Sequence, residues 1–251
     1  MSVQQNYSIL RIEHVGKSFA DGQGLHVLDD ISLELCEGEF VSIIGPSGCG
    51  KSTLLKMVAG LLPVSTGRII FQGKEVIAPA PERGVVFQEA RLFPWLTVKE
   101  NISFGLPEDI DAIKTNRIIA EYIHLVGLDG FADTYPAQLS GGMQQRCSIA
   151  RTLAGKPRLL LLDEPFGALD AMTRIRMQQE ITRIWQAEKM TILLITHDID
   201  EALFLSDRVV VMSDRPASIR DIYSIGLPRP RDRNGPEFVG LRRTLYEEFF
   251  T

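Results

Sequence analysis

Short apolar runs and alternating apolar and polar positions divide the chain into predicted strands. Ile9–Val15 and Val27–Leu35 alternate in part, on either side of the turn-rich Asp21–Gly24, which is typical of strands with one buried face. Phe40–Ile44 is a continuous apolar run that ends at a glycine, as strands buried on both faces do. The other predicted strands are Arg68–Gln72, Gly84–Phe87, Arg158–Asp163, Thr191–Thr196 and Val209–Ser213.

Apolar residues recur at helical spacing between several of these strands. The predicted helices are Thr53–Leu62, Ile110–Val126, Gly141–Leu153, Ala171–Lys189 and Glu237–Phe250. Strands that alternate with helices predict an α/β fold with a mostly parallel sheet. The first two strands predict an N-terminal antiparallel β subdomain.

The patterns also predict how the chain is divided into parts. From about Glu89 to Gly155 the β-branched runs vanish, so we expect an α-helical insertion over 89–155. Residues 1–88 and 156–225 form the predicted α/β core. Residues 226–251 form a proline-broken linker and a closing helix.

The composition narrows the class of protein. The 251 residues include 27 Lys and Arg against 32 Asp and Glu, a net charge of −5, which argues against nucleic acid as a partner. Cys36, Cys49 and Cys147 form no CxxC pair, so neither a disulfide framework nor a zinc site is expected. No apolar run approaches the roughly 18–20 residues of a membrane span, and the first ten residues lack a signal-peptide pattern. We therefore expect a soluble chain of a reducing compartment.

One glycine-rich segment fits the pattern G-x-x-x-x-G-K-[ST], after a predicted buried strand and before a helix. Its glycines let successive N–H groups face phosphate oxygens, and the helix N-terminus adds partial positive charge. We expect Lys51 to reach the β- and γ-phosphates of a nucleotide, and the Ser52 hydroxyl to bind Mg²⁺. The predicted nucleotide-binding residues are Gly45, Pro46, Ser47, Gly48, Cys49, Gly50, Lys51, Ser52 and Thr53.

Two carboxylates end the predicted strand Arg158–Asp163. Asp163, at the carboxyl end of the strand, is placed to hold Mg²⁺ through water. Glu164 lies one residue further and points differently, which suits a carboxylate that polarises water for attack on a γ-phosphate. The sequence thus predicts a nucleotide-hydrolysing site with the loop above.

Further motifs follow in a fixed order along the chain. Leu139–Arg146 reads Leu-Ser-Gly-Gly-Met-Gln-Gln-Arg and closely precedes the carboxylate pair. This segment resembles the signature motif of ATP-binding-cassette (ABC) ATPases. Gln88 matches the Q-loop of that family, Ala168–Asp170 the D-loop, His197 the switch histidine and Phe19 the adenine-stacking aromatic. The resemblance covers nearly the whole chain and implies the P-loop NTPase fold of the ABC ATPases, with ATP and Mg²⁺ as ligands.

The resemblance also implies roles for these residues. Gln88 would serve Mg²⁺ and catalysis, and His197 would contact the γ-phosphate and orient Glu164 and the water. Phe19 and Asp170 would belong to the nucleotide site. From the residues alone other readings stay open, because a histidine at a strand end is more often structural and an aromatic near a strand is more often core.

A predicted helix begins at Ser140, Gly141 and Gly142. The N–H groups of its first turn have no partner within the helix, so this N-terminus favours an anion. The resemblance implies a head-to-tail dimer in which these residues cap the ATP that a second copy binds. Met143 departs from the glutamine most common in the family. Because the serine and glycines make the phosphate contact, we do not infer lost activity. Cys49 reads as a small filler whose thiol a helix N-terminus can activate.

The remaining segments concern the partner. Ala90–Trp95 places aromatics and arginine where the helical insertion begins, a composition suited to docking or, equally, to the core of the insertion. With Leu227–Arg233 and Pro236–Phe238, it resembles nitrate, sulfonate and taurine importers. Thiamine-precursor importers are close relatives. The arginines near 230 also fit a solvated tail.

The resemblance implies a peripheral subunit at the cytoplasmic face of the inner membrane. Its partners would be integral-membrane permease subunits and, indirectly, an extracytoplasmic solute-binding protein. A soluble ABC ATPase of iron–sulfur assembly is the alternative. DNA-repair members carry coiled-coil or zinc insertions, and this sequence has neither heptads nor a Cys cluster.

Overall fold

The computed structural model describes residues 8–19, 24–107 and 111–249. The predicted turn residues 21–23 and the predicted helix ends Ile110 and Phe250 lie outside the described residues. The chain divides into two compact units, residues 1–80 with 189–251 and residues 81–188. These bounds differ from the predicted ones at 88/89 and 155/156, so the proposed division into domains stays a prediction.

The alternating N-terminal region of the first unit forms a four-stranded antiparallel sheet in the order β2-β1-β4-β5. Its strands are β1 (Ser8–Phe19), β2 (Leu25–Cys36), β4 (Thr66–Phe71) and β5 (Lys74–Glu75). Ile12 lies opposite Leu33 on β2 and Ile69 on β4, and all three are buried. The predicted antiparallel subdomain is therefore confirmed.

A second group of strands in the first unit contains the continuous apolar runs. Its strands are β3 (Phe40–Ile44), β8 (Thr191–Ile195), β9 (Arg208–Met212) and β10 (Ile219–Ser224). β3 lies between β8 and β9 and runs parallel to both, and β10 pairs antiparallel with β9. Every residue of β3 and β8 is buried, as expected for strands covered on both faces. The helices of this unit are α1 (Lys51–Val58), α6 (Ile199–Leu205) and α7 (Pro236–Phe249).

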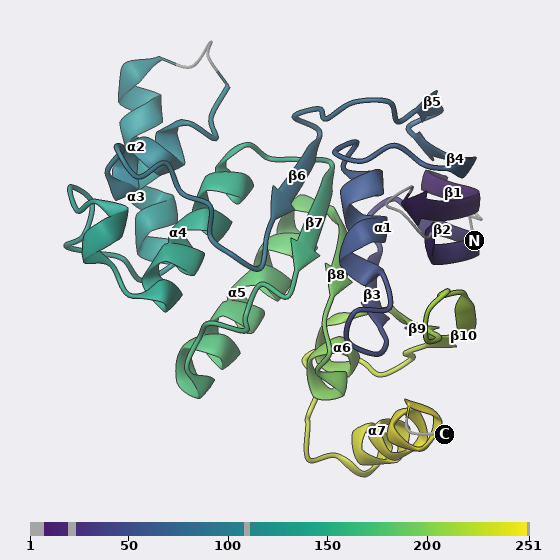
Figure 1. Ribbon diagram of the computed structural model, residues 1–251. Helices are drawn as coiled ribbons and strands as arrows, with labels where there is room; N and C mark the ends of the chain where they lie inside the picture. The colour runs from purple at the N-terminus through teal and green to yellow at the C-terminus, as the bar shows by residue number, and fades with distance from the viewer. Residues whose placement is uncertain (1–7, 20–23, 108–110, 250–251) are drawn as a thin grey trace, which may run out of the picture. The chain divides into compact units, whose positions relative to one another are not determined.

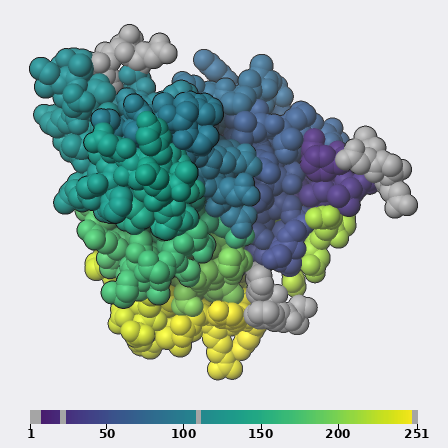
Figure 2. Space-filling view, turned by 60° about the vertical axis from the view of Figure 1, so that its left-hand side comes forward, coloured from purple at the N-terminus to yellow at the C-terminus, as the bar shows by residue number. Residues whose placement is uncertain are grey.

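The C-terminal arginines of this unit have a structural role. The Arg231 side chain is 6% exposed and donates hydrogen bonds to the carbonyl oxygens of Leu203 (2.5 Å), Ser206 (2.6 Å) and Ile225 (3.1 Å). Arg229 pairs with Asp207 at 2.7 Å. The interpretation of these arginines as a solvated tail is therefore wrong, because they bind the carbonyl-rich C-terminal end of α6. Beyond them, much of α7 (yellow in Figure 2) is exposed at the surface.

The second unit contains two parallel strands and the predicted helical segment (Figure 1). Its elements are β6 (Arg83–Val86), α2 (Val98–Ser103), α3 (Ala112–Leu125), a 3₁₀ turn (Pro136–Gln138), α4 (Gly141–Ala154), β7 (Leu159–Asp163) and α5 (Ala171–Glu188). α2, α3 and α4 pack against one another. In the part of the chain that the structure describes, no helix is both long and apolar enough to cross a membrane.

Candidate functional site

The glycine-rich loop joins the buried end of β3 to the start of α1. Gly48 and Gly50 adopt φ values of 76° and 126°, which a residue with a Cβ rarely adopts. Space also requires a glycine at position 50, because a Cβ there would lie 2.8 Å from side-chain atoms of both Val27 and Leu28. The loop is thus a tight backbone cradle held against β2.

The Lys51 ammonium lies within this cradle. Its Nζ donates to the carbonyl oxygens of Gly45 (2.7 Å) and Pro46 (2.8 Å) and lies 3.9 Å from the Cys49 Sγ. Lys51 is 6% exposed and Cys49 is 2% exposed. The loop therefore holds the Lys51 ammonium in one position, largely shielded from solvent. The burial of Cys49 agrees with its reading as a small filler.

The order of the strands brings His197 to the same edge as the loop. Ile43 of β3 pairs with Ile195 of β8, so Gly45 and His197 each follow a paired position by two residues. His197 is exposed, and Asp198 caps α6 by accepting from the Glu201 N–H at 3.1 Å. Carboxyl ends of parallel strands are where ligands bind in sheets of this kind.

Phe19 is the last residue of β1 and is half-buried. The Lys17 Nζ lies 5.0 Å from the centroid of its ring, close enough for a cation–π interaction. Lys17 also donates to the Pro63 carbonyl oxygen at 2.7 Å. Lys17 thus links the Phe19 ring to the backbone at Pro63. Stacking of this ring on adenine stays a prediction.

The second unit contains the carboxylate pair and the Q-loop glutamine. Asp163 ends β7 and is 5% exposed, while the next residue, Glu164, is half-buried. Glu164 has φ of 45°, a left-handed conformation that a non-glycine residue holds only when its surroundings fix it. The Gln88 Nε2 donates to the Glu164 Oε2 at 3.4 Å. The unit thus brings Gln88 and Glu164 together.

The predicted signature residues cap α4. The Ser140 Oγ accepts from the Met143 N–H at 3.3 Å, and Ser140 and Gly141 are exposed. A Cβ at Gly142 would lie 3.2 Å from the Ala168 carbonyl oxygen, whereas one at Gly141 would meet no described atom within 4 Å. The second glycine therefore allows the close approach of the D-loop.

Asp170 follows in the D-loop and caps α5. Its Oδ1 accepts from the N–H groups of Met172 (3.1 Å) and Thr173 (3.0 Å), and hydrogen bonds from Thr173 lower the pKa of Asp170. This local role is visible in the structure. A contact of Asp170 with nucleotide stays a prediction.

A loop beside the Q-loop presents aromatic side chains that sequence reasoning described only in part. Trp95 is 68% exposed and Phe104 is 65% exposed, and the Phe93 ring lies 5.6 Å from Trp95 and 4.5 Å from Phe104, between centroids. We call residues 93–97 the aromatic loop. The sequence analysis missed Phe104 because this residue lies seven positions after the end of the aromatic loop. Its ring contacts Phe93 only in the folded chain.

A buried asparagine fixes the backbone of the aromatic loop. Asn101, which is fully buried, donates through Nδ2 to the carbonyl oxygens of Phe93 (3.2 Å), Leu96 (2.9 Å) and Thr97 (3.0 Å). Its Oδ1 accepts from the Phe93 N–H at 2.9 Å. No sequence signal pointed to Asn101, because its partners are backbone atoms.

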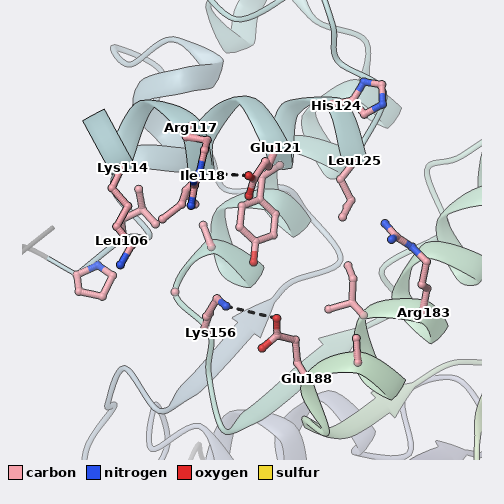
Figure 3. Close-up of a pocket in the computed structure, with 16 residues that line it drawn as sticks. Leu106, Lys114, Arg117, Ile118, Glu121, His124, Leu125, Lys156, Arg183 and Glu188 are labelled. Carbon is pink, nitrogen blue, oxygen red and sulfur yellow. Dashed lines mark hydrogen bonds and ion pairs between the residues drawn. The ribbon is translucent and has the colours of Figure 1, made fainter. Parts of the chain in front are cut away.

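A cavity of about 710 Å³ lies between α3 and α5 within the second unit (Figure 3). Its apolar lining includes Leu106, Ile118, Leu125 and Ile184. Its charged lining includes Lys114, Arg117, Lys156 and Arg183 with Glu121 and Glu188. Dashed lines in Figure 3 mark the ion pairs Arg117–Glu121 (3.5 Å) and Lys156–Glu188 (3.3 Å). Arg183 of the lining pairs with Glu180 at 2.8 Å, so the charges of this lining are largely balanced within the protein.

Comparison with known proteins agrees with these motifs. The family model described as ABC transporter matches residues 28–167. An uncharacterized ABC transporter ATP-binding protein of Methanocaldococcus jannaschii is 50% identical over 240 residues, which cover 94% of this chain and 89% of the relative. The aliphatic sulfonates import ATP-binding protein SsuB of Bacillus cereus is 46% identical over 239 residues, which cover 95% and 94%. A dimeric ATP-binding cassette in a post-hydrolysis state, bound to ADP and phosphate, has a TM-score of 0.79 at 29% identity and covers 87% of this chain and 100% of its own.

Proposed function

The chain belongs to the family of ABC transporter ATPases, and from this premise we propose that it is the motor subunit of an importer. The proposed solute is a small oxyanion such as nitrate, a sulfonate or taurine. The observation that carries the importer and its solute class is the similarity to the aliphatic sulfonates import protein over almost the full length of both chains. The identity of 46% to that protein is well above the 29% to the similar dimeric cassette.

We assign the first unit to holding the phosphates. The loop amides and the N-terminus of α1 would bind the phosphate oxygens, and Lys51 would exchange its bonds to the Gly45 and Pro46 carbonyl oxygens for bonds to the β- and γ-phosphates. A phosphate oxygen carries more charge than a carbonyl, so the new hydrogen bonds are stronger. His197, at the same edge, would contact the γ-phosphate.

We assign the second unit to water activation. Glu164 would polarise the attacking water, and Gln88, its hydrogen-bond donor, would hold the carboxylate in place. The predicted Mg²⁺ ligands, Ser52 of the first unit and Gln88 and Asp163 of the second, each carry a side-chain oxygen, which fits a hard cation such as Mg²⁺. When bound, that ion neutralises charge that develops on the transferred phosphoryl group.

We infer that two copies act together. Ser140 and Gly141 at the start of α4 are exposed, and a helix start with accessible N–H groups favours an anion. The similar cassette bound to ADP and phosphate is a dimer, which supports the prediction that these residues cap the ATP of a second copy. ATP would close the dimer and hydrolysis would reopen it.

We propose that a cytoplasmic helix of the permease docks on the second unit. The exposed rings of the aromatic loop offer apolar anchors, and the cavity of Figure 3 offers an apolar wall beside charged side chains. An amphipathic helix, with one apolar and one polar side, fits both features. The subunit would thus be peripheral to the inner membrane, at its cytoplasmic face.

Two experiments test this function. Glu164→Gln is expected to keep ATP binding, lose turnover and trap an ATP-bound dimer in size-exclusion chromatography; near wild-type hydrolysis would remove Glu164 from its role. Reconstitution of the chain with its permease and solute-binding protein in liposomes is expected to give ATP-driven uptake of taurine, an alkanesulfonate or nitrate. Uptake of a thiamine precursor alone would overturn the proposed solute class.

A further inference from the structure

One face of α4 is hydrogen-bonded along the segment that leads from β6 to the aromatic loop. Gln145 Nε2 donates to the Phe87 carbonyl oxygen at 2.9 Å. The single hydroxyl hydrogen of Thr152 is shared between the Ser148 carbonyl oxygen of the same helix (3.0 Å) and the Val85 carbonyl oxygen (3.2 Å). Further along, Arg151 Nη2 donates to the carbonyl oxygens of residues 91 (3.0 Å) and 90 (3.4 Å). Three side chains of one helix thus hold a continuous stretch of backbone that includes Gln88.

Burial protects these bonds unequally, because the bond from Arg151 to the carbonyl oxygen of residue 91 is exposed. Gln145 is 1% exposed, and burial lowers the pKa of Arg151. Hydrogen bonds away from water are costly to break, because each leaves a desolvated donor or acceptor without a partner. These hydrogen bonds tie α4 to residues 85–91 within the second unit.

Arg151 is the member of this set that also reaches the aromatic loop. Its guanidinium lies 5.5 Å from the centroid of the Phe93 ring, within range of a cation–π interaction. The backbone around it is equally close-packed, because a Cβ at Gly105 would lie 1.9 Å from the Arg151 carbonyl oxygen. A displacement of Phe93 would therefore move the Arg151 side chain, which is hydrogen-bonded to residues 90 and 91, just after Gln88.

We propose that Arg151 is a positioning residue that transmits motion between the aromatic loop and Gln88, the hydrogen-bond donor of Glu164. Docking of a partner on the loop would shift residues 90–91 through Arg151, and with them Gln88. ATP binding would in turn shift the aromatic loop, since the coupling free energy between two sites is reciprocal. The partner half of this inference rests on the proposed docking of a permease.

The ATP half can be tested on the chain alone. The sequence has two tryptophans, so Trp185→Phe leaves Trp95 as the single fluorescent reporter in the aromatic loop. In a Glu164→Gln, Trp185→Phe parent, Mg²⁺ and ATP are expected to change acrylamide quenching of Trp95. Arg151→Met is expected to abolish that change, while the dissociation constant for ATP stays within about twofold. Arg151→Lys keeps the charge and is expected to restore part of the response.

The matched control is Arg146→Met on the same helix. Arg146 also donates to two carbonyl oxygens, those of Val126 (2.7 Å) and Gly127 (2.8 Å), but these end α3 and are far from Gln88 in sequence. This variant is expected to keep the Trp95 response. An unchanged response in Arg151→Met, an equal loss in Arg146→Met, or a parent without any response would each overturn the proposal.

The experiments distinguish a failure of the proposed docking from a failure of the proposed coupling. If the parent chain binds ATP and shows the Trp95 response but captures no permease from detergent-solubilised membranes, the docking is wrong and the coupling within the chain stands. If the permease is captured and the Trp95 response survives Arg151→Met, the coupling role of Arg151 is wrong and the docking stands.

Discussion

Replacing Arg231 by methionine removes a guanidinium while keeping an unbranched side chain of similar reach. Three buried carbonyl oxygens, those of Leu203, Ser206 and Ile225, lose their side-chain donor. Burial lowers the pKa of Arg231 to about 10, so the guanidinium is still protonated at neutral pH and its hydrogen bonds are charge-assisted.

The size of the effect follows from those three bonds. A buried carbonyl left without a partner costs about 1–3 kcal/mol, and water that enters recovers part of this. We expect Arg231→Met to lower the free energy of unfolding by about 3 kcal/mol. For a chain of this length, 1 kcal/mol shifts the melting temperature by about 2–4 °C, so the midpoint should fall by about 6–12 °C.

The assay is thermal and urea unfolding followed by circular dichroism. Arg243→Met is the control, because Arg243 is exposed on α7 and pairs with Glu247 at 2.7 Å on the same exposed helix surface; it should cost less than about 0.5 kcal/mol. A loss below about 1 kcal/mol in Arg231→Met would refute the reasoning, since the carbonyls would then not depend on the arginine.

Four further outcomes are expected. Gly142→Ala should lower the rate of ATP hydrolysis by about tenfold or more in a steady-state assay, because the added Cβ would lie 3.2 Å from the Ala168 carbonyl oxygen and displace the D-loop; an unchanged rate would contradict this. Trp95→Ala should reduce capture of the permease by about tenfold in pull-down assays, with little change in melting temperature, because the ring is 68% exposed. Hydrogen bonds from the backbone and side chain of the α2 cap lower the pKa of Glu100 below 4.5, so this carboxylate stabilises the fold above about pH 4.5 and the effect is lost as pH falls through the lowered pKa; Glu100→Gln should flatten the dependence of the melting temperature on pH in that range. Gly240→Ala should raise the free energy of unfolding by about 0.5–1 kcal/mol in urea titration, because α7 has room for the Cβ.

The strands that sequence reasoning found were those whose burial shows in their composition. β3, β7 and β8 are entirely buried, and their apolar runs predicted each of them to within about a residue. β10 was missed because it pairs only at one edge and carries Arg220 and Asp221 on an exposed surface. α2 was missed because six residues are too few to show helical periodicity.

In the candidate site too, some residues could be predicted from a sequence pattern and others could not. The phosphate loop, Asp163 and Glu164 were predicted because their chemistry requires particular residue types at particular spacing. Asn101, Gln145 and Arg151 were not predicted, since they act on backbone carbonyl oxygens. A carbonyl is present at every residue, so the choice of partner depends on the fold and leaves no pattern in the sequence.

The four hydrogen bonds of Asn101 have a consequence for how partners change over evolution. They fix the backbone at Phe93, Leu96 and Thr97 and leave the side chain of Trp95 uninvolved. Trp95, which would meet the permease in the proposed docking, can therefore be exchanged without refolding the segment that presents it. On the proposed docking, an exchange at this one position would change the surface offered to a permease, and the preorganised backbone would keep the entropic cost of each new association low.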